Sequence, residues 1–204
     1  MLLRRKTTRR RFKLPLTREQ AETALLAAVQ AEVEYRGHIY TDIASTIGCI
    51  AQAAEWITGG GKPGILLCGL PGNGKTTLAR AIVSLVNIFD IPGENGGMLR
   101  AKFETARDIC RYCKKDDAKY RVLTEAPLLV IDDMGEEPQE IIDYGMPLSP
   151  VSDMLLYRYD RQLATVATTN LVNRQLREKY GDRLADRFNE MMSVIVFKNP
   201  TFRQ

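Results

Sequence analysis

Apolar and polar residues along this chain alternate between two kinds of segment. Short, mostly apolar segments that predict strands occupy residues 64–68, 98–103, 127–132, 164–168 and 193–197, and those at 64–68 and 127–132 are typical of buried strands. Apolar residues at helical spacing predict helices near 76–89, 104–115 and 150–163, a helix that starts at Asn173, and one over 182–192. Strands that alternate with helices form right-handed β-α-β units. The pattern therefore predicts a three-layer α/β/α sandwich around a parallel sheet.

Two further helices are predicted before the first strand. The first spans residues 17–36 with a capping box of Thr17 and Gln20, and Gly37 is a suitable stop. The second begins near Thr41 or Asp42 and ends at the glycines 59–61. This pair could bind a partner or cover the sheet, and the sequence leaves both open. We expect a flexible tail at 1–16, a helical extension at 17–60 and one domain at 61–204, with an acidic loop of uncertain shape at 133–148.

Composition narrows the classes of protein. The hydrophobic fraction of 45% is ordinary for a globular chain, and no run approaches the ~20 apolar residues of a membrane span. We expect the four cysteines to be free thiols and the protein to be cytoplasmic, where thiols stay reduced. Residues 1–13 carry seven of the 29 basic residues, which leaves 22 against 25 acidic ones elsewhere. This tail could bind nucleic-acid phosphates or an acidic partner, or could be only a solvated end.

Residues 69–77 carry the most informative motif, G-x-x-x-x-G-K-[ST], between a predicted strand and a predicted helix. Its backbone N–H groups and the helix N-terminus attract phosphate, Lys75 would reach the β- and γ-phosphates, and Thr76 would hold Mg²⁺. The sequence thus predicts that the chain binds ATP with Mg²⁺. The expected nucleotide contacts are Gly69, Pro71, Gly72, Asn73, Gly74, Lys75, Thr76 and Thr77.

Acidic and amide side chains follow two later strands. Asp132 and Asp133 end an apolar strand, where Asp132 would hold the metal and Asp133 would act as general base toward water. Asn170 follows the next strand and could orient the same water. Arg183 and Arg187 share one helix face, either to reach a neighbouring subunit's γ-phosphate or to pair with Asp182 and Asp186.

Together these segments resemble the DnaC/IstB group of AAA+ ATPases, the helicase loaders and transposition helpers. The resemblance lies in the order of motifs, at residues 102–106, 128–135 (Walker B), 157–159 with 164–171 (sensor 1), 180–188 (Box VII) and 201–203 (sensor 2). It implies roles for Asn170 as sensor 1, Arg187 or else Arg183 as the trans-acting finger, and Arg203 as sensor 2. It also implies no C-terminal helical lid, and a helix over about 104–119 that contacts single-stranded DNA.

By this resemblance the chain is an ATPase that self-associates through its ATP sites. It would help to place a hexameric replicative helicase on single-stranded DNA, with no membrane partner. A transposition helper that acts with a transposase remains an alternative, as does an ATP-gated binding module with little hydrolysis. Cys110 and Cys113 form no second pair and His38 stands alone, so we expect no zinc site, which needs four ligands.

Overall fold

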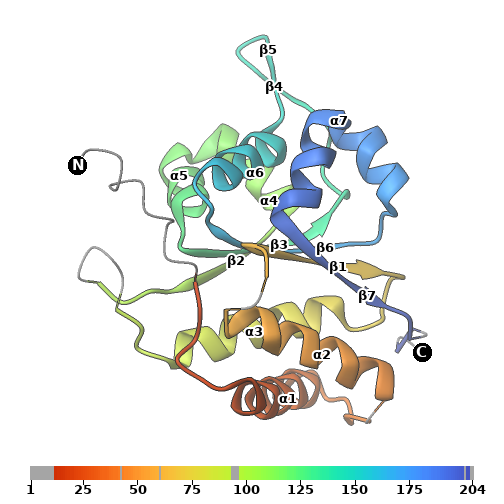
Figure 1. The fold of residues 1–204 in the computed structure, drawn as a ribbon. Coiled ribbons are helices and arrows are strands. Elements are labelled where there is room, and N and C mark those ends of the chain that lie inside the picture. Colours follow the sequence, from red (N-terminus) through yellow and green to blue (C-terminus); the bar gives the residue numbers. More distant parts are fainter. Residues whose placement is uncertain (1–11, 42, 60, 93–96, 200, 203–204) are drawn as a thin grey trace.

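The fold is centred on a parallel sheet of five strands (Figure 1). The structure, a computed structural model, describes residues 12–41, 43–59, 61–92, 97–199 and 201–202. The strands lie in the order β2-β3-β6-β1-β7. They are β1 (Gly64–Gly69), β2 (Ala101–Thr105), β3 (Leu128–Met134), β6 (Ala164–Thr169) and β7 (Met192–Phe197). The predicted α/β/α sandwich is confirmed.

Helices cover both faces of this sheet (Figure 1). One layer contains α1 (Arg18–Tyr35), α2 (Ala44–Ile57) and α3 (Lys75–Ile88). The other contains α4 (Ala106–Lys115), α5 (Asp117–Glu125), α6 (Pro150–Asp160) and α7 (Asn173–Met191). None of the helices in the described part of the chain is both long and apolar enough to cross a membrane.

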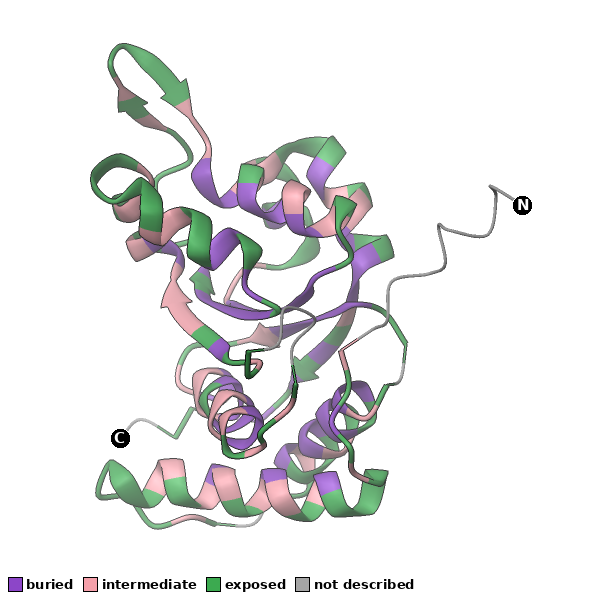
Figure 2. Cartoon of the chain, turned by 90° about the vertical axis from the view of Figure 1, so that its left-hand side faces the viewer, coloured by how far each residue is buried: buried purple, intermediate pink, exposed green. Residues whose placement is uncertain are grey.

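The central strands are largely apolar because each of their faces packs against a helical layer. In β3, Leu128 and Val130 contact the cluster that includes α1–α3, whereas Leu129 and Ile131 contact the cluster that includes α4–α7. Buried residues accordingly concentrate along the central strands, and the outer helices are buried on one side only (Figure 2). The sheet thus separates two hydrophobic clusters.

The N-terminal helices cover the sheet beside α3. The Thr17–Gln20 capping box forms as predicted, and α1 and α2 contribute to the same buried cluster as β1 and α3. Within the range expected to be tail, packing begins at Phe12: Leu14 is buried and its N–H donates to the Ile57 carbonyl over 2.8 Å. Residues 1–11, which hold most of the basic tail, lie outside the described residues.

Three local predictions need correction. The strand predicted at 98–103 begins at Ala101, because Met98 forms a β-bridge with Pro92 and the Leu99 N–H donates to the Ile91 carbonyl. The helical segment that was expected to run from 104 to as far as 119 is two helices, since Asp116 caps α5 by accepting from the Lys119 N–H over 2.9 Å.

The acidic loop also has structure that the sequence did not suggest. It contains a two-stranded hairpin, β4 (Ile141–Asp143) and β5 (Met146–Leu148), which projects away from the sheet (Figure 1). Tyr144 and Gly145 both have positive φ at its turn, as the tight hairpin turn requires. Strands of three residues are too short to give an alternating pattern in the sequence.

Candidate nucleotide-binding site

The phosphate loop joins β1 to α3, as the sequence predicted. Gly72 and Gly74 have φ of 78° and 96°, values that L side chains rarely adopt, and Gly74 is the N-cap of α3. At Gly69 a Cβ would lie 2.6 Å from the Phe197 carbonyl oxygen, so only glycine fits there. The loop therefore turns tightly and directs backbone N–H groups of the α3 N-terminus toward the site of an anion.

Lys75 lies inside this loop and is buried. Its ammonium donates to the carbonyl oxygens of Gly69 (2.8 Å) and Leu70 (2.7 Å) and to Asn73 Oδ1 (3.1 Å). These oxygens hold the charge inside the curve of the loop, where the phosphates of a nucleotide are bound in this motif. The structure thus places the Lys75 ammonium within the phosphate loop.

A segment near the C-terminus packs along the phosphate loop, which the sequence did not indicate. Asn73 Nδ2 donates to the Phe197 carbonyl (3.2 Å), and Asn199 Nδ2 donates to the Asn73 carbonyl (2.7 Å). The Phe202 N–H donates to the Gly72 carbonyl over 2.8 Å. Arg203, the expected sensor 2 residue, follows directly but lies outside the described residues.

The metal-binding residues of the prediction lie together. Thr76 Oγ1 donates to Asp132 Oδ1 over 3.0 Å, and Thr168 Oγ1 donates to the same oxygen over 2.7 Å. Burial raises the pKa of Asp132, and the two hydroxyl donors act against that rise. Mg²⁺ is typically bound by one or two carboxylates, substrate phosphates and water. A hydroxyl and one carboxylate beside a phosphate loop fit that ion, and no cluster of three or more metal-binding side chains occurs in the described ranges.

Asp133 follows at a β-bulge, where the pairing of β3 with β6 shifts register. It adopts φ of 53°, its side chain is exposed, and its N–H donates to Thr168 Oγ1 over 2.9 Å. One Thr168 hydroxyl therefore binds both acidic residues, a role that the sequence reasoning missed. Asn170 is the first residue after β6 and is partly buried. Because β3, β6 and β1 are neighbours and parallel, Asp133, Asn170 and the phosphate loop lie at one edge of the sheet.

Arg183 and Arg187 lie on α7, in the layer opposite α3. Their expected ion-pair partners are bound elsewhere, because Arg177 forms ion pairs with Asp182 and with Asp186 (2.9 Å to the latter). Arg183 is exposed. The Arg187 guanidinium stacks over the Tyr159 ring at 5.2 Å, and its Nη1 is buried without a hydrogen-bond partner. No contact between either arginine and the phosphate loop occurs among the described residues.

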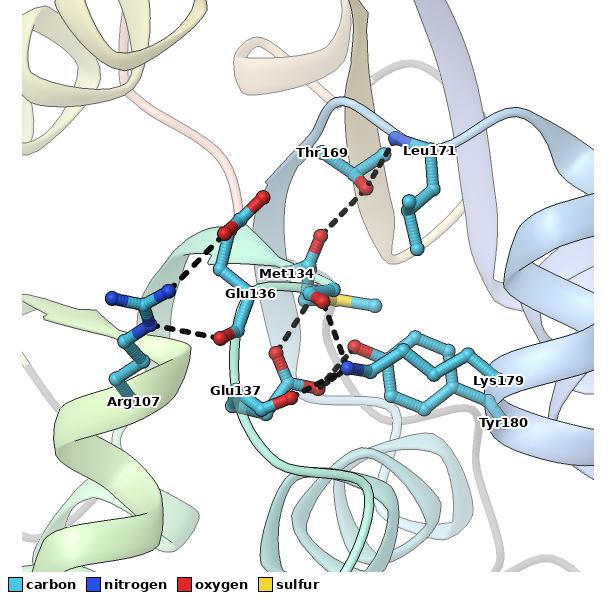
Figure 3. A network of polar contacts seen from close by, with 9 residues as sticks. Arg107, Met134, Glu136, Glu137, Thr169, Leu171, Lys179 and Tyr180 are labelled. Carbon is cyan, nitrogen blue, oxygen red and sulfur yellow. Dashed lines mark hydrogen bonds and ion pairs between the residues drawn. The ribbon is translucent and has the colours of Figure 1, made fainter.

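Residues 135–137, directly after β3, are held from three sides (Figure 3). At the end of β6, Thr169 Oγ1 donates to the Met134 carbonyl over 2.7 Å. From α4, Arg107 Nε donates to the Glu136 carbonyl over 2.8 Å and its Nη2 pairs with the Glu136 carboxylate. From α7, Lys179 and Tyr180 both contact Glu137. No local pattern in the sequence indicates this network, because its members are far apart along the chain.

Three of the four basic residues of α4 form contacts within the chain. In addition to Arg107, Arg111 pairs with Asp108 over 2.8 Å and Lys114 donates to the Ile142 carbonyl of the hairpin over 3.0 Å. Exposed contacts of this kind contribute little free energy each and can exchange for phosphate contacts. The predicted role of this helix toward single-stranded DNA thus stays a prediction.

Comparison with known proteins gives relatives in structure alone. No family model and no curated protein sequence matches the chain. A DnaC helicase loader superimposes with a TM-score of 0.61 at 23% identity, covering 78% of this chain and 93% of the other. A DnaI structure superimposes with a TM-score of 0.62 at 20% identity, covering 87% of this chain and 93% of the other. AMPPCP-bound DnaA from Aquifex aeolicus superimposes with a TM-score of 0.54 at 19% identity, covering 76% of this chain and 48% of the other. The chain thus has the same α/β P-loop fold as these DnaC, DnaI and DnaA structures.

Proposed function

We propose that this protein binds ATP with Mg²⁺ and hydrolyses it at the contact between two copies of the chain. The observation that carries the proposal is the hydrogen bond between Thr76 of the phosphate loop and Asp132 of β3, which joins the two expected halves of a Mg²⁺-nucleotide site. The structural likeness to a DnaA with AMPPCP bound supports a nucleotide as the ligand.

Each group has a distinct part in the proposed reaction. Lys75 leaves the loop carbonyls for the β- and γ-phosphates and neutralises charge there. Thr76 and Asp132 would hold Mg²⁺, which when bound neutralises developing charge on the phosphate oxygens. Asp133, exposed at its bulge, accepts a proton from the attacking water, and Asn170 orients that water.

The arginine finger, which reaches the γ-phosphate of another subunit, is proposed to come from a neighbouring copy of the chain. Arg187 lies on the sheet face opposite α3 and has an unpartnered Nη1, and its acidic neighbours are bound by Arg177. Since no acidic side chain of the described residues forms an ion pair with Arg187, none competes with a phosphate of another subunit for its guanidinium. Arg187 is our first candidate and Arg183 the second.

Hydrolysis by a shared site can be tested by kinetics. The ATPase rate per chain should rise with protein concentration, and Arg187→Ala should lower the rate by ~10³-fold or more while ATP affinity is kept. Arg174→Ala is the matched control, since Arg174 is an exposed α7 arginine paired with Glu178. A rate per chain that is independent of concentration, or equal losses in both variants, would refute the shared site.

We further propose that the protein acts as a helicase loader in replication. The likeness to a DnaC helicase loader and the basic α4 support this proposal. Affinity purification with a non-hydrolysable ATP analogue should recover a hexameric replicative helicase, and a gel shift should show ATP-dependent binding of single-stranded DNA. Recovery of a transposase together with a preference for duplex DNA would instead indicate a transposition helper.

A further inference from the structure

Glu137 is a buried carboxylate that the proposed reaction does not use. It is 4% exposed and accepts hydrogen bonds from the Gly135 N–H (2.8 Å) and the Tyr180 hydroxyl. The Lys179 ammonium lies 3.9 Å from its carboxylate and donates to the Gly135 carbonyl over 2.8 Å. Burial, and then the charge of Glu137, raises the pKa of Tyr180, so its phenol remains a donor. The first part of α7 is thus tied to the residues that follow Asp133 (Figure 3).

The helix that carries the arginines changes direction directly after these contacts. Gly181 has φ of 79° and ψ of 164°, which interrupts α7 one residue after Tyr180. Arg177, before the break, pairs with Asp182 and Asp186 beyond it. These exposed ion pairs bridge the break, and the buried side chains of Leu184, Phe188 and Met191 pack the second part of α7 into the hydrophobic cluster. The Glu137 contacts therefore hold the start of α7 against residues 135–137, and the packing of the second part, with the Arg177 ion pairs, orients Arg187 from there.

We propose that Glu137 and Tyr180 are positioning residues, which hold Arg187 at a fixed place relative to the loop that begins at Asp133. The inference rests on the proposed shared ATP site and adds to it the device that aligns the donated arginine. The connection runs from Asp133 through residues 135–137 to the start of α7, and then across the Gly181 break to Arg187.

The chemistry of the network favours a role in geometry. A buried carboxylate with a lysine and a phenol is weak evidence for added stability, because desolvation offsets the attraction. Directional hydrogen bonds to a carboxylate do restrict the distance and angle between the loop and the helix. Reaction rates are sensitive to such placement: a shift of about 1 Å in a catalytic group can lower a rate by ~10²-fold.

Mixing two inactive variants provides the test, with Arg187→Ala chains as acceptors of a finger and Lys75→Ala chains as donors. The mixture should regain ATPase activity, because each acceptor keeps its phosphate loop and each donor keeps Arg187. Adding Tyr180→Phe to the donor should lower that regained rate by ten- to a hundredfold. Adding it to the acceptor should change the rate less than twofold, although either chain would suffer equally from a loss of stability.

Tyr157→Phe in the donor is the matched control, because Tyr157 donates to Glu125 on α5 over 3.2 Å, away from α7. It should leave the regained rate unchanged. Donors with and without Tyr180→Phe that restore equal rates would overturn the positioning role while leaving the shared site intact. A Lys75→Ala donor that restores no activity would overturn the shared site itself, and the positioning role with it.

Discussion

Replacing Thr168 with valine removes the hydroxyl that holds the acidic end of β3. This hydroxyl is buried, donates to Asp132 over 2.7 Å and accepts from the Asp133 N–H over 2.9 Å. Valine has nearly the same shape, so packing is retained. A hydrogen bond to a charged group contributes about 1.5–3 kcal/mol, and a buried N–H without a partner costs about 1–3 kcal/mol. Because Asp133 is exposed and water reaches it, we expect a loss of about 2–4 kcal/mol in the free energy of unfolding.

Urea unfolding followed by Trp56 fluorescence and circular dichroism measures this loss. For a chain of this size the melting temperature falls by about 2–4 °C for each kcal/mol, so roughly 5–15 °C is expected. Thr46→Val is the matched control, because the Thr46 hydroxyl is buried without a hydrogen-bond partner, and its removal should be neutral or stabilising. A Thr168→Val protein within about 0.5 kcal/mol of the unmodified one would refute the reasoning.

The same variant should also bind nucleotide differently. Asp132 would lose one of its two hydroxyl donors and would hold Mg²⁺ less well, since its carboxylate is positioned by Thr76 and Thr168 together. ATP affinity should therefore fall more in the presence of Mg²⁺ than in EDTA. Equal losses under both conditions would show that Thr168 supports the fold but not the metal site.

Three further outcomes follow from single contacts. Arg158→Met should destabilise the fold by about 3–5 kcal/mol in urea unfolding. Its buried guanidinium caps the end of α5 by donating to the carbonyls of residues 123, 124 and 126. A change below about 1 kcal/mol would contradict this. Gly135→Ala should lower the free energy of unfolding by about 2–4 kcal/mol, because Gly135 has φ of 106° and its added Cβ would lie 2.5 Å from Leu171. Leu171→Ala should recover the part of this loss that comes from the clash. No recovery would show that the clash is unimportant. Arg36→Ala should weaken ATP binding about three- to tenfold in a fluorescence titration, since Arg36 donates to Thr77 of the phosphate loop over 2.9 Å. Equal weakening by Arg18→Ala, which removes an arginine paired with Glu22, would show that the effect comes from the overall charge of the protein and not from this contact.

The sequence was most informative where one local pattern determines both conformation and chemistry. The phosphate loop is such a case, because its glycines, Lys75 and Thr76 are contiguous and lie between a strand and a helix. The parallel sheet was predictable for a similar reason, since strands buried on both faces are apolar without interruption. The placement of Asp132 beside Thr76 follows from that topology.

Contacts between distant segments were not predictable. Nothing near Thr168 in the sequence indicates that its hydroxyl would bind two acidic residues of β3, and nothing near Glu137 indicates a bond to Tyr180. Arg158 is charged but fully buried, which contradicts the ordinary expectation for arginine. In each case the partner is chosen by the packed fold, which a local pattern does not encode.

The central sheet also separates two groups of segments that have different proposed roles. The side chains that pack below it support the phosphate loop, and those above it carry the projecting hairpin and the α7 arginines. Substitutions at the tip of the hairpin β4–β5, which projects away from the sheet, should therefore change the outer surface of the molecule and leave the phosphate loop undisturbed.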